Sequence, residues 1–415
     1  MHPLFQQHWS GRRVLLLQGP LGGFFSRLGK WLRAQGAHTQ RIAFNGGDWL
    51  FEPSAKLFRG SLLQWRAALR QEILERGYTD IMLFGDCRPV HRVALALARR
   101  LGVRAWVFEE GYLRPNWITC EEGGVNAHSP LMAGWPQEHG YAARAEPASK
   151  PNRRWTYQAM VLQASAYWLA ASLLRWFFRA PHHRSLNALS ESLCWLRGYA
   201  RKLWHAWAER DLMKTLQSER PPFVLLALQV HNDTQIRHHS DYSDVWDFIE
   251  ESLRSFAEHA PPSMHLVAKH HPMDRAYRDY SRRIRALSKT LGVEHRVHVA
   301  HDQHLPTLLN MAKGCLTVNS TVGLQALHHR VPVKTMGRAF YGREELTHQG
   351  DLSEFWAWCE RTEPPVAAYL RLERHLKSFV LINENFYWPL GTFSAKKKNA
   401  KSPADETRLL APSKR

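Results

Sequence analysis

The chain has 415 residues, of which 44% are hydrophobic and 22% are charged. This composition excludes a disordered chain, and the length exceeds what one ordinary core uses, so we expect two domains with appended segments. The formal net charge of +19 indicates an anionic partner or surface, which nucleic acid, anionic lipid or a phosphorylated substrate would each provide.

The cysteines and the amino-terminal segment predict the compartment. The five cysteines contain no CxxC pair, which predicts neither a zinc site nor a disulfide framework: they are Cys87, Cys120, Cys194, Cys315 and Cys359. Residues 1–10 are polar and lack the apolar core of a signal sequence, and no stretch is typical of a transmembrane span. We therefore expect a cytoplasmic protein, with attachment to a membrane surface left open.

Strands and helices alternate through residues 1–150, which predicts an amino-terminal α/β domain with a parallel sheet. The expected strands start near residues 14, 41, 80 and 103, and helices are expected at 24–35, 62–76 and 91–100. The turn after the first strand holds Gly19, Gly22 and Gly23 but matches neither the dinucleotide-binding fingerprint nor a phosphate loop. We interpret these glycines as room for a ligand or a loop to approach the backbone.

Residues 151–220 predict a helical, Trp- and Arg-rich insertion between the two domains. An apolar stripe on the first helix, 160–178, contains Leu162, Leu169, Leu173 and Trp176, with Ser172, Arg175 and Arg179 on the other face. On the second helix, Trp195, Trp204 and Trp207 alternate with Arg197, Arg201 and Lys202. Such helices suit an anionic membrane surface, and a helical pair packed against the two domains explains the same pattern.

A second α/β domain is predicted over residues 221–345. Its first strand, 223–228, is a continuous apolar run after Pro221 and Pro222, typical of a strand buried on both faces of a parallel sheet. Further strands are expected to start near residues 264, 296, 314 and 331, with helices at 244–256, 277–291, 305–311 and 322–328. Residues 346–393 predict carboxy-terminal helices, and residues 394–415 predict a disordered tail.

Polar clusters stand at four of the predicted strand ends, where parallel sheets bind their ligands: Glu109-Glu110-Gly111, Gln229 to Asp233, His271-Pro272 and Ser320-Thr321. Each has an ordinary interpretation, since Asp233 and Ser320 are good helix N-caps and a His-Pro pair arises by chance in this composition. Together they provide a carboxylate that can act as base or nucleophile, and imidazole and hydroxyl groups that can hold a phosphate. Transfer of a sugar from a nucleotide donor requires both.

Two such domains facing each other across a cleft would place Glu109 and Glu110 opposite His271 and Ser320. No DxD-type metal motif follows a strand, so we predict no metal and no cofactor. The acidic residues that come nearest to such a motif fit the start of a helix instead: Asp241, Asp244 and Asp247.

The same clusters occur within longer motifs: Leu17-Gln-Gly-Pro, Phe44-Asn-Gly-Gly-Asp, Leu83-Phe-Gly-Asp-Cys-Arg-Pro, Phe108-Glu-Glu-Gly-Tyr-Leu-Arg-Pro and Gln229-Val-His-Asn-Asp. In their order, these motifs resemble the capsule polysaccharide synthesis family, specifically its KpsS/LipB-type members, from about residue 14 to 387. The acidic-Gly, His-Pro and Ser-Thr pairs are also similar to those of bacterial sialyltransferases and related transferases of CMP-activated sugars.

The resemblance implies a GT-B-like architecture and a retaining β-Kdo glycosyltransferase. Such an enzyme moves Kdo from CMP-β-Kdo to phosphatidylglycerol or lyso-phosphatidylglycerol, which initiates the poly-Kdo linker of capsular polysaccharide. It implies a peripheral location on the inner face of the inner membrane. It also implies, as partners, a KpsC-type Kdo transferase that extends the linker and the capsule export machinery.

The resemblance also implies roles for single residues. Asp233 would be the nucleophile or base, and Glu110, with Glu109 beside it, the acid/base group. The CMP donor would be held by Gln229, His271, Pro272, Asn319, Ser320 and Thr321. We add Arg88 and Arg114 as partners of the Kdo carboxylate, because guanidinium pairs bidentately with carboxylate.

Two other functions would use the same basic charge. The alternative for this family is a non-catalytic capsule polysaccharide export or modification component, which needs a basic surface but not the carboxylates at the strand ends. A nucleic-acid binder would spread its aromatic residues along a groove, and the chain contains no recognition motif of that class. We therefore expect no nucleic-acid partner.

Overall fold

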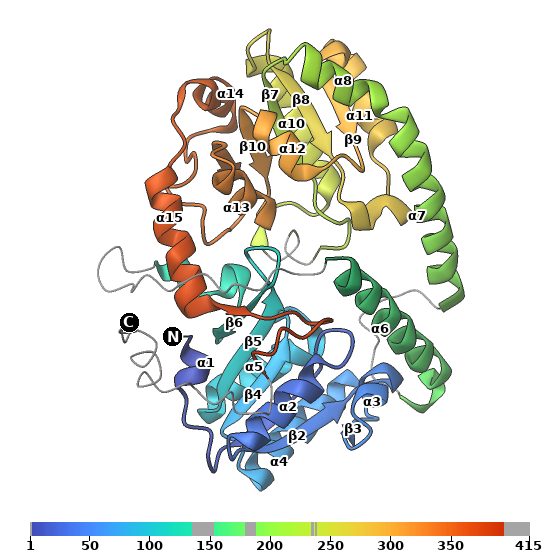
Figure 1. The fold of residues 1–415 in the computed structure, drawn as a ribbon, viewed down its shortest axis with the longest axis vertical. Helices are drawn as coiled ribbons and strands as arrows, with labels where there is room; N and C mark the ends of the chain where they lie inside the picture. Colours follow the sequence, from blue (N-terminus) through green and yellow to red (C-terminus); the bar gives the residue numbers. More distant parts are fainter. Residues whose placement is uncertain (1, 135–152, 179–187, 234–235, 237–238, 394–415) are drawn as a thin grey trace, which may run out of the picture.

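The computed structural model describes residues 2–134, 153–178, 188–233, 236 and 239–393, and it contains two sheets covered by helices (Figure 1). The tail predicted at 394–415, Arg179 and the side chain of Trp195 lie outside the described residues. The first sheet has seven strands in the order β12-β6-β5-β4-β1-β2-β3, and the second has five in the order β11-β10-β7-β8-β9. The predicted α/β fold class with two parallel-rich domains is confirmed.

The strands of the first sheet are β1 (Arg13–Leu16), β2 (His38–Ala43), β3 (Lys56–Leu57), β4 (Asp80–Phe84), β5 (Arg104–Glu110), β6 (Trp117–Glu122) and β12 (Leu381–Asn383). Those of the second are β7 (Phe223–Ala227), β8 (His265–Lys269), β9 (Val297–Ala300), β10 (Gly314–Thr317) and β11 (Val333–Thr335).

The helices of the amino-terminal half are α1 (Pro3–Gln6), α2 (Phe24–Ala34), α3 (Gly46–Phe51), α4 (Leu62–Arg76), α5 (Pro89–Leu101), η1 (Asn126–His128) and η2 (Pro130–Ala133). The insertion contains α6 (Arg153–Leu173), η3 (Arg175–Phe177), α7 (Ala188–Ala208) and α8 (Arg210–Ser218). The remaining helices are α10 (Val245–His259), η4 (Pro272–Ala276), α11 (Ser281–Thr290), η5 (Glu294–Arg296), α12 (Leu305–Met311), α13 (Thr321–His328), α14 (Leu352–Arg361), α15 (Val366–His375) and the π-helical η6 (Leu376–Val380).

Strand β7 is the centre of the second sheet, and all five of its residues are buried. It pairs in parallel with β8 and β10. Phe223 and Leu225 pack into one hydrophobic cluster, and Val224 and Leu226 pack into the cluster on the opposite face. The unbroken apolar run therefore reflects the burial of both faces of β7, as the sequence predicts. A strand with helices on both faces has no exposed side for polar residues.

Strand β12 returns the carboxy-terminal segment to the first sheet, where it pairs antiparallel with β6. In Figure 1 the chain leaves the second domain through α15 and crosses back to the first. The prediction of helices alone in 346–393 is wrong, because β12 lies there, and β6 is not among the predicted strands. Both strands form the non-parallel edge of the sheet, and β12 has only three residues, too few for a periodic pattern.

Helix α6 is docked on the first domain through Tyr167, whose hydroxyl donates to Asp48 Oδ1 at 3.0 Å. A Cβ atom at Gly47 would lie 2.6 Å from the Tyr167 ring, and one at Gly22 would lie 2.1 Å from Gln163 Oε1. Gly22 and Gly47 thus permit the approach of α6. The close approach predicted at the first glycine-rich turn occurs at Gly22, where Gln163 of α6 packs against the backbone.

Helix α7 is docked on the second domain. The Nε of Arg197 donates to the carbonyl oxygen of Ala276 at 2.8 Å, and Arg201 donates to that of Arg275 at 2.9 Å. The segment α6–α8 therefore joins the two domains, and its two longest helices lie on different domains (Figure 1). Among the described residues, no helix combines the length and apolar character that a membrane crossing requires.

A buried ion pair holds the segment after α7 on the second domain. His301 Nδ1 lies 2.6 Å from Glu209 Oε1, and its Nε2 lies 3.5 Å from Asp279 Oδ1. The His301 ring stacks on His205 of α7 with centroids 3.6 Å apart. Burial disfavours the charged imidazole, but the hydrogen bonds with Asp279 and Glu209 outweigh it and raise the pKa of His301. Below pH 6.5 the charged histidine is therefore part of this attachment.

We expect Glu209→Gln to lower the free energy of unfolding by about 1–3 kcal/mol near pH 6, because it leaves buried His301⁺ without one anion. The raised pKa of His301 means that its stabilisation is complete below pH 6.5 and is lost as the pH rises through the folded-state value. The cost of the substitution should therefore shrink at about pH 9, which urea unfolding at both pH values measures. The control Asp211→Asn, at an exposed pair with Lys214, should change little at either pH, and equal costs for Glu209→Gln at both would contradict the charged clamp.

Candidate functional site

The side chain of Gln229 organises the carboxyl ends of β7 and β10. Its Nε2 donates to Asp233 Oδ2 at 2.9 Å and to Asn319 Oδ1 at 3.0 Å, while its Oε1 accepts from the main-chain N of Asn319 at 3.1 Å. Gln229 is buried, so these contacts replace its hydration. Three of the predicted site residues are thus brought together in one network, with the Asp233 carboxylate held at its edge.

The loop after β7 is tied to the loop after β8. The main-chain N of His231 donates to Asp274 Oδ2 at 2.9 Å, and the His231 ring is hydrogen-bonded to the same carboxylate. Asp274 lies in η4, which begins directly after His271. The position of His271 is therefore coupled to the segment that carries Gln229 and Asp233.

His271 is neutral at physiological pH. Burial and the charges of Arg114 and Lys269 lower its pKa to about 4. Its Nδ1 accepts a hydrogen bond from the main-chain N of Met273 at 3.2 Å, which assigns the ring proton to Nε2. The imidazole is thus a fixed N–H donor, which suits an anionic oxygen.

Glu109 and Glu110 are the last residues of β5, opposite Thr119 and Ile118 of β6. Burial raises the pKa of Glu109 to about 7 and also raises the pKa of Glu110. Arg88 lies near the first carboxylate and Arg114 near the second, and each opposes the rise. A carboxyl group that titrates near neutrality is suited to general acid–base chemistry.

Arg88 is held by hydrogen bonds to residues that follow β1. It donates to Gln18 Oε1 at 2.9 Å and to the carbonyl oxygen of Gly19 at 3.2 Å. Gln18 in turn donates to Asp48 at 3.1 Å, and Asp48 accepts from Tyr167 of α6. The residues of the two glycine-containing motifs near Gln18 and Asp48 therefore position Arg88 and α6.

Arg114 links the two halves of the site. It belongs to the turn after β5 in the first domain. Its charge opposes the rise that burial causes in the pKa of Glu110, and it adds to the lowering that burial causes in the pKa of His271 in the second domain. A direct contact also joins loops of the two domains here, since Cys87 Sγ after β4 lies 3.7 Å from His239 Nε2. The predicted site residues of the first domain are Glu109, Glu110, Arg88 and Arg114, and those of the second include Gln229, Asp233, Asn319 and His271.

The other predicted donor-binding residues lie next to this group. Ser320 is the N-cap of α13, because its side chain accepts from the main-chain N of Val322 at 3.2 Å, which is the ordinary role considered for it. Thr321 begins α13 and Pro272 begins η4. The side chain of Asp233 accepts a hydrogen bond from Gln229. The residues that directly follow Asp233 are outside the described residues, so its interpretation as a helix N-cap stays a prediction.

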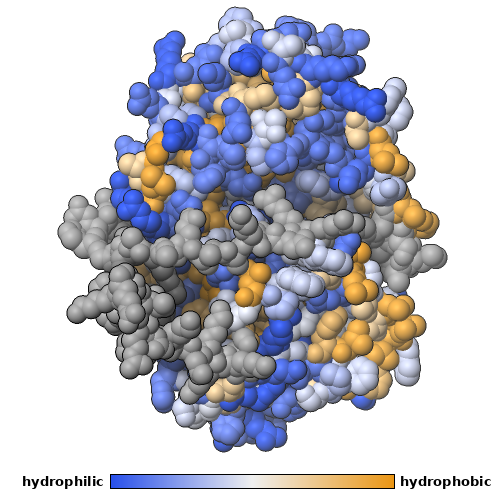
Figure 2. All heavy atoms as spheres, viewed as in Figure 1, coloured by the Kyte–Doolittle hydropathy of each residue, from blue (hydrophilic) through white to orange (hydrophobic). Residues whose placement is uncertain are grey.

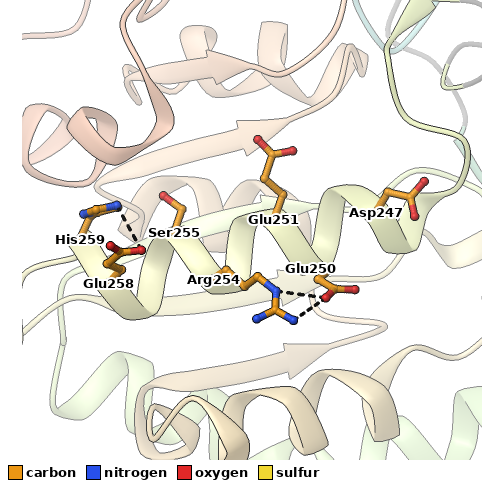
Figure 3. A pocket seen from close by; sticks show the side chains of 7 residues that line it. All are labelled: Asp247, Glu250, Glu251, Arg254, Ser255, Glu258 and His259. Atoms are coloured by element: carbon orange, nitrogen blue, oxygen red, sulfur yellow. Dashed lines mark hydrogen bonds and ion pairs between the residues drawn. The ribbon is translucent and has the colours of Figure 1, made fainter.

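A hollow of about 510 Å³ runs along α10, away from the strand ends (Figure 3). All of its lining residues come from this one helix, and Glu250 is paired with Arg254 at 2.7 Å. Asp244 is the N-cap of α10 and Asp247 completes the capping box, which confirms the predicted acidic helix start. This hollow therefore reflects helix capping and surface pairs and is separate from the site.

Two further groups bring potential metal ligands together among the described residues: Cys87 with His128 and His239, and His205 with Asp279 and His301. The first lies at the domain interface, beside the residues described above. Its members are spread over more than one hundred residues of sequence, so no spacing pattern could have revealed it. The prediction of no metal rests only on motifs of closely spaced residues, which do not include this group.

The chain thus combines two parallel-rich α/β sheets with polar residues after their strands. Residues 79–387 match the family described as capsule polysaccharide biosynthesis protein. The chain belongs to this family.

Two curated relatives span nearly the whole chain. The capsule polysaccharide export protein KpsS of Escherichia coli is 40% identical over 354 residues, which cover 84% of this chain and 90% of that protein. The capsule polysaccharide modification protein LipB of Neisseria meningitidis serogroup B is 34% identical over 410 residues, covering 95% and 96%.

Solved structures are similar at lower identity. The β-Kdo 2,7 transferase KpsC of Thermosulfurimonas dismutans has 17% identity and a TM-score of 0.40, over 88% of this chain and 100% of that one. A glycosyltransferase of Rickettsia africae has 8% identity and a TM-score of 0.37, over 88% and 92%. Both similarities concern the fold.

We expect Glu109→Gln to stabilise the protein at about pH 8, by about 1–3 kcal/mol. Because burial raises the pKa of Glu109 from 4.5 to about 7, the ionised group costs stability that appears as the pH rises between these values. Urea unfolding at about pH 5 and about pH 8 should show the gain only at the higher pH.

Glu121→Gln is the matched control, since burial also raises the pKa of Glu121 to about 7. Its carboxylate accepts from the hydroxyls of Tyr112 and Ser129, so the amide should disturb a satisfied network and lower stability. A loss of stability for Glu109→Gln at both pH values would show that Glu109 is a structural group.

Proposed function

We propose that the chain is a retaining β-Kdo glycosyltransferase that moves Kdo from CMP-β-Kdo to a phosphatidylglycerol-type lipid and so initiates the poly-Kdo linker of capsular polysaccharide. The observation that carries the proposal is that carboxylates stand at or after the carboxyl ends of β5 and β7, one strand in each sheet. Asp233 is held by Gln229, and Glu109 and Glu110 lie among buried groups beside Arg88 and Arg114. Retaining transfer through two carboxylates requires such a pair.

The remaining residues support binding of an anionic donor. The neutral His271 offers an N–H toward phosphate, and the first turn of α13, at Thr321, has the positive end of the helix dipole. We assign Asp233 as nucleophile or base, Glu110 as the acid/base group, and Arg88 and Arg114 as partners of the sugar carboxylate. Guanidinium groups suit a carboxylate because both of its oxygens accept hydrogen bonds.

Asp233→Ala should lower CMP release from CMP-Kdo in the presence of phosphatidylglycerol about 100- to 10,000-fold, because it removes the carboxylate that attacks or deprotonates. Mass spectrometry of the lipid identifies the Kdo-bearing product. Asp241→Ala is the control, since Asp241 is exposed and pairs only at the surface with Arg338. Absence of CMP release by the wild-type protein with every phosphatidylglycerol-type acceptor would refute the proposed reaction.

The names of the relatives, an export protein and a modification protein, favour a second candidate, a non-catalytic capsule component. This function would need neither Asp233 nor Glu110. Intact glycolipid synthesis in cells that carry Asp233→Ala in place of the wild-type chain would support it. A KpsC-type transferase would act after this chain under the first proposal, since it would extend the first Kdo.

We further propose that the chain works on the inner face of the inner membrane, with α6 and α7 against anionic lipid. Eleven apolar or aromatic side chains on these helices and η3 are at least 59% exposed: Tyr157, Leu162, Leu169, Leu173, Trp176, Leu193, Leu196, Tyr199, Leu203, Trp204 and Trp207. Figure 2 shows hydrophobic residues gathered over this side of the molecule. Isolated exposed apolar residues are ordinary, whereas a continuous set of this size indicates an interaction surface.

Replacing both Trp204 and Trp207 with serine should weaken binding to phosphatidylglycerol vesicles about 10-fold or more, measured by co-sedimentation. Binding of the wild-type chain should also weaken with salt, because lysine and arginine on these helices attract anionic lipid. Leu63→Ser is the control, since Leu63 is 93% exposed but lies on α4. Equal binding to neutral and anionic vesicles would contradict the contribution of charge.

A further inference from the structure

Cys87, His128 and His239 meet at the domain interface, where one ligand atom of each lies within 4.8 Å of the others. Cys87 follows β4 and His128 ends η1, both in the first domain, whereas His239 belongs to the second. The rings of His128 and His239 are edge to face with centroids 4.7 Å apart. Three side chains from three separate segments thus point to one place.

The separation of the sulfur and nitrogen atoms fits tetrahedral coordination of a metal ion. Cys87 Sγ and His239 Nε2 are 3.7 Å apart. Zinc bonds of about 2.3 Å to sulfur and about 2.0 Å to nitrogen, at a tetrahedral angle, place these two atoms about 3.5 Å apart. The Cys87 thiol also donates to Asp86 Oδ1 at 3.2 Å, a contact that it would exchange for the ion on losing its proton.

His128 is oriented as a metal-binding histidine is. Its Nδ1 lies 3.0 Å from Asp86 Oδ2, which leaves Nε2 for a ligand. A carboxylate on the opposite ring nitrogen is the usual device that sets the tautomer of a metal-bound imidazole. A Cβ atom at Gly124 would lie 2.6 Å from His128 Cβ, so the glycine permits this placement of the histidine.

His239 is held from the other domain by its backbone. Its carbonyl oxygen accepts from the main-chain N of Arg338 at 2.7 Å and from Asn319 Nδ2 at 3.3 Å. Asn319 is also bonded to Gln229, which holds Asp233. The ligand from the second domain is therefore joined to the network at the ends of β7 and β10.

The second potential ligand group, His205 with Asp279 and His301, is a poorer metal site. Both ring nitrogens of His301 already face partners, Glu209 on one side and Asp279 with Ser281 on the other. An ion would have to displace these contacts. This group therefore serves as an internal control.

We propose that Cys87, His128 and His239 bind a divalent transition-metal ion of the zinc class. One thiolate and two imidazoles suit a borderline-soft cation, and three protein ligands leave the fourth tetrahedral position for an exogenous ligand. Because the ligands come from both domains, the ion would couple the two domains. Asp86 is the positioning residue of the site.

The full-length chain, purified without chelators and with any affinity tag removed, should contain about one zinc ion by plasma mass spectrometry. Cobalt-loaded protein should show the thiolate-to-cobalt charge-transfer band of a cysteine ligand. Cys87→Ser should abolish this band and reduce the bound metal at least about 10-fold, and Asp86→Asn should weaken zinc binding about 10- to 100-fold. His205→Gln should leave both metal measurements unchanged.

His239→Gln provides an independent test if Cys87→Ser fails to fold, since it keeps the backbone contacts of His239. Circular dichroism verifies that each variant is folded. Metal content that is equal in the wild-type chain and in a folded Cys87→Ser or His239→Gln variant would overturn the proposal. A wild-type chain that shows no saturable binding of zinc or cobalt at one ion per chain would also overturn it, as would bound cobalt without the thiolate band.

Discussion

The amide of Gln229 is the contact on which the arrangement of the second domain's site depends. Its two ends are used at once, with the nitrogen on Asp233 and Asn319 and the oxygen on the backbone of Asn319. No carboxylate could replace it, because a carboxylate has no donor to offer Asp233. The buried strand β7 supplies a rigid base for this amide, and the loop that follows is anchored again through His231 and Asp274.

Two buried carboxyl groups of the first domain, Glu109 and Glu121, have different hydrogen-bond partners. The pKa values of Glu109 and Glu121 are both raised to about 7 by burial. Glu121 accepts from two hydroxyls within the protein, which is how a structural carboxyl is satisfied, whereas Glu109 stands at the end of β5 beside Arg88. The same desolvation thus accompanies two hydroxyl contacts at Glu121, and at Glu109 a contact with the main-chain N of Glu110 at the end of β5.

The helical insertion packs against both domains and still exposes apolar side chains. Its inner faces are docked on the two domains through Tyr167 and Arg201, as the interpretation of packed helices requires. Its outer faces keep the leucine and tryptophan residues exposed, including the predicted stripe with Leu162 and Trp176. A helix has enough circumference for both, so docking to the protein does not remove the surface that a membrane would use.

Much of this protein could be predicted from the sequence alone, because much of it depends on local patterns. The unbroken apolar run at β7, the helix at Leu62–Arg76 and the clusters of polar residues after each strand follow from periodicity and from the rule that ligands bind at strand ends. Only the tertiary structure decided that β12 returns to the first sheet, that Gly22 and Gly47 make room for α6, and that Cys87, His128 and His239 converge. These features join residues far apart in the chain, and the position of such residues is set by how the domains pack, which no local pattern encodes.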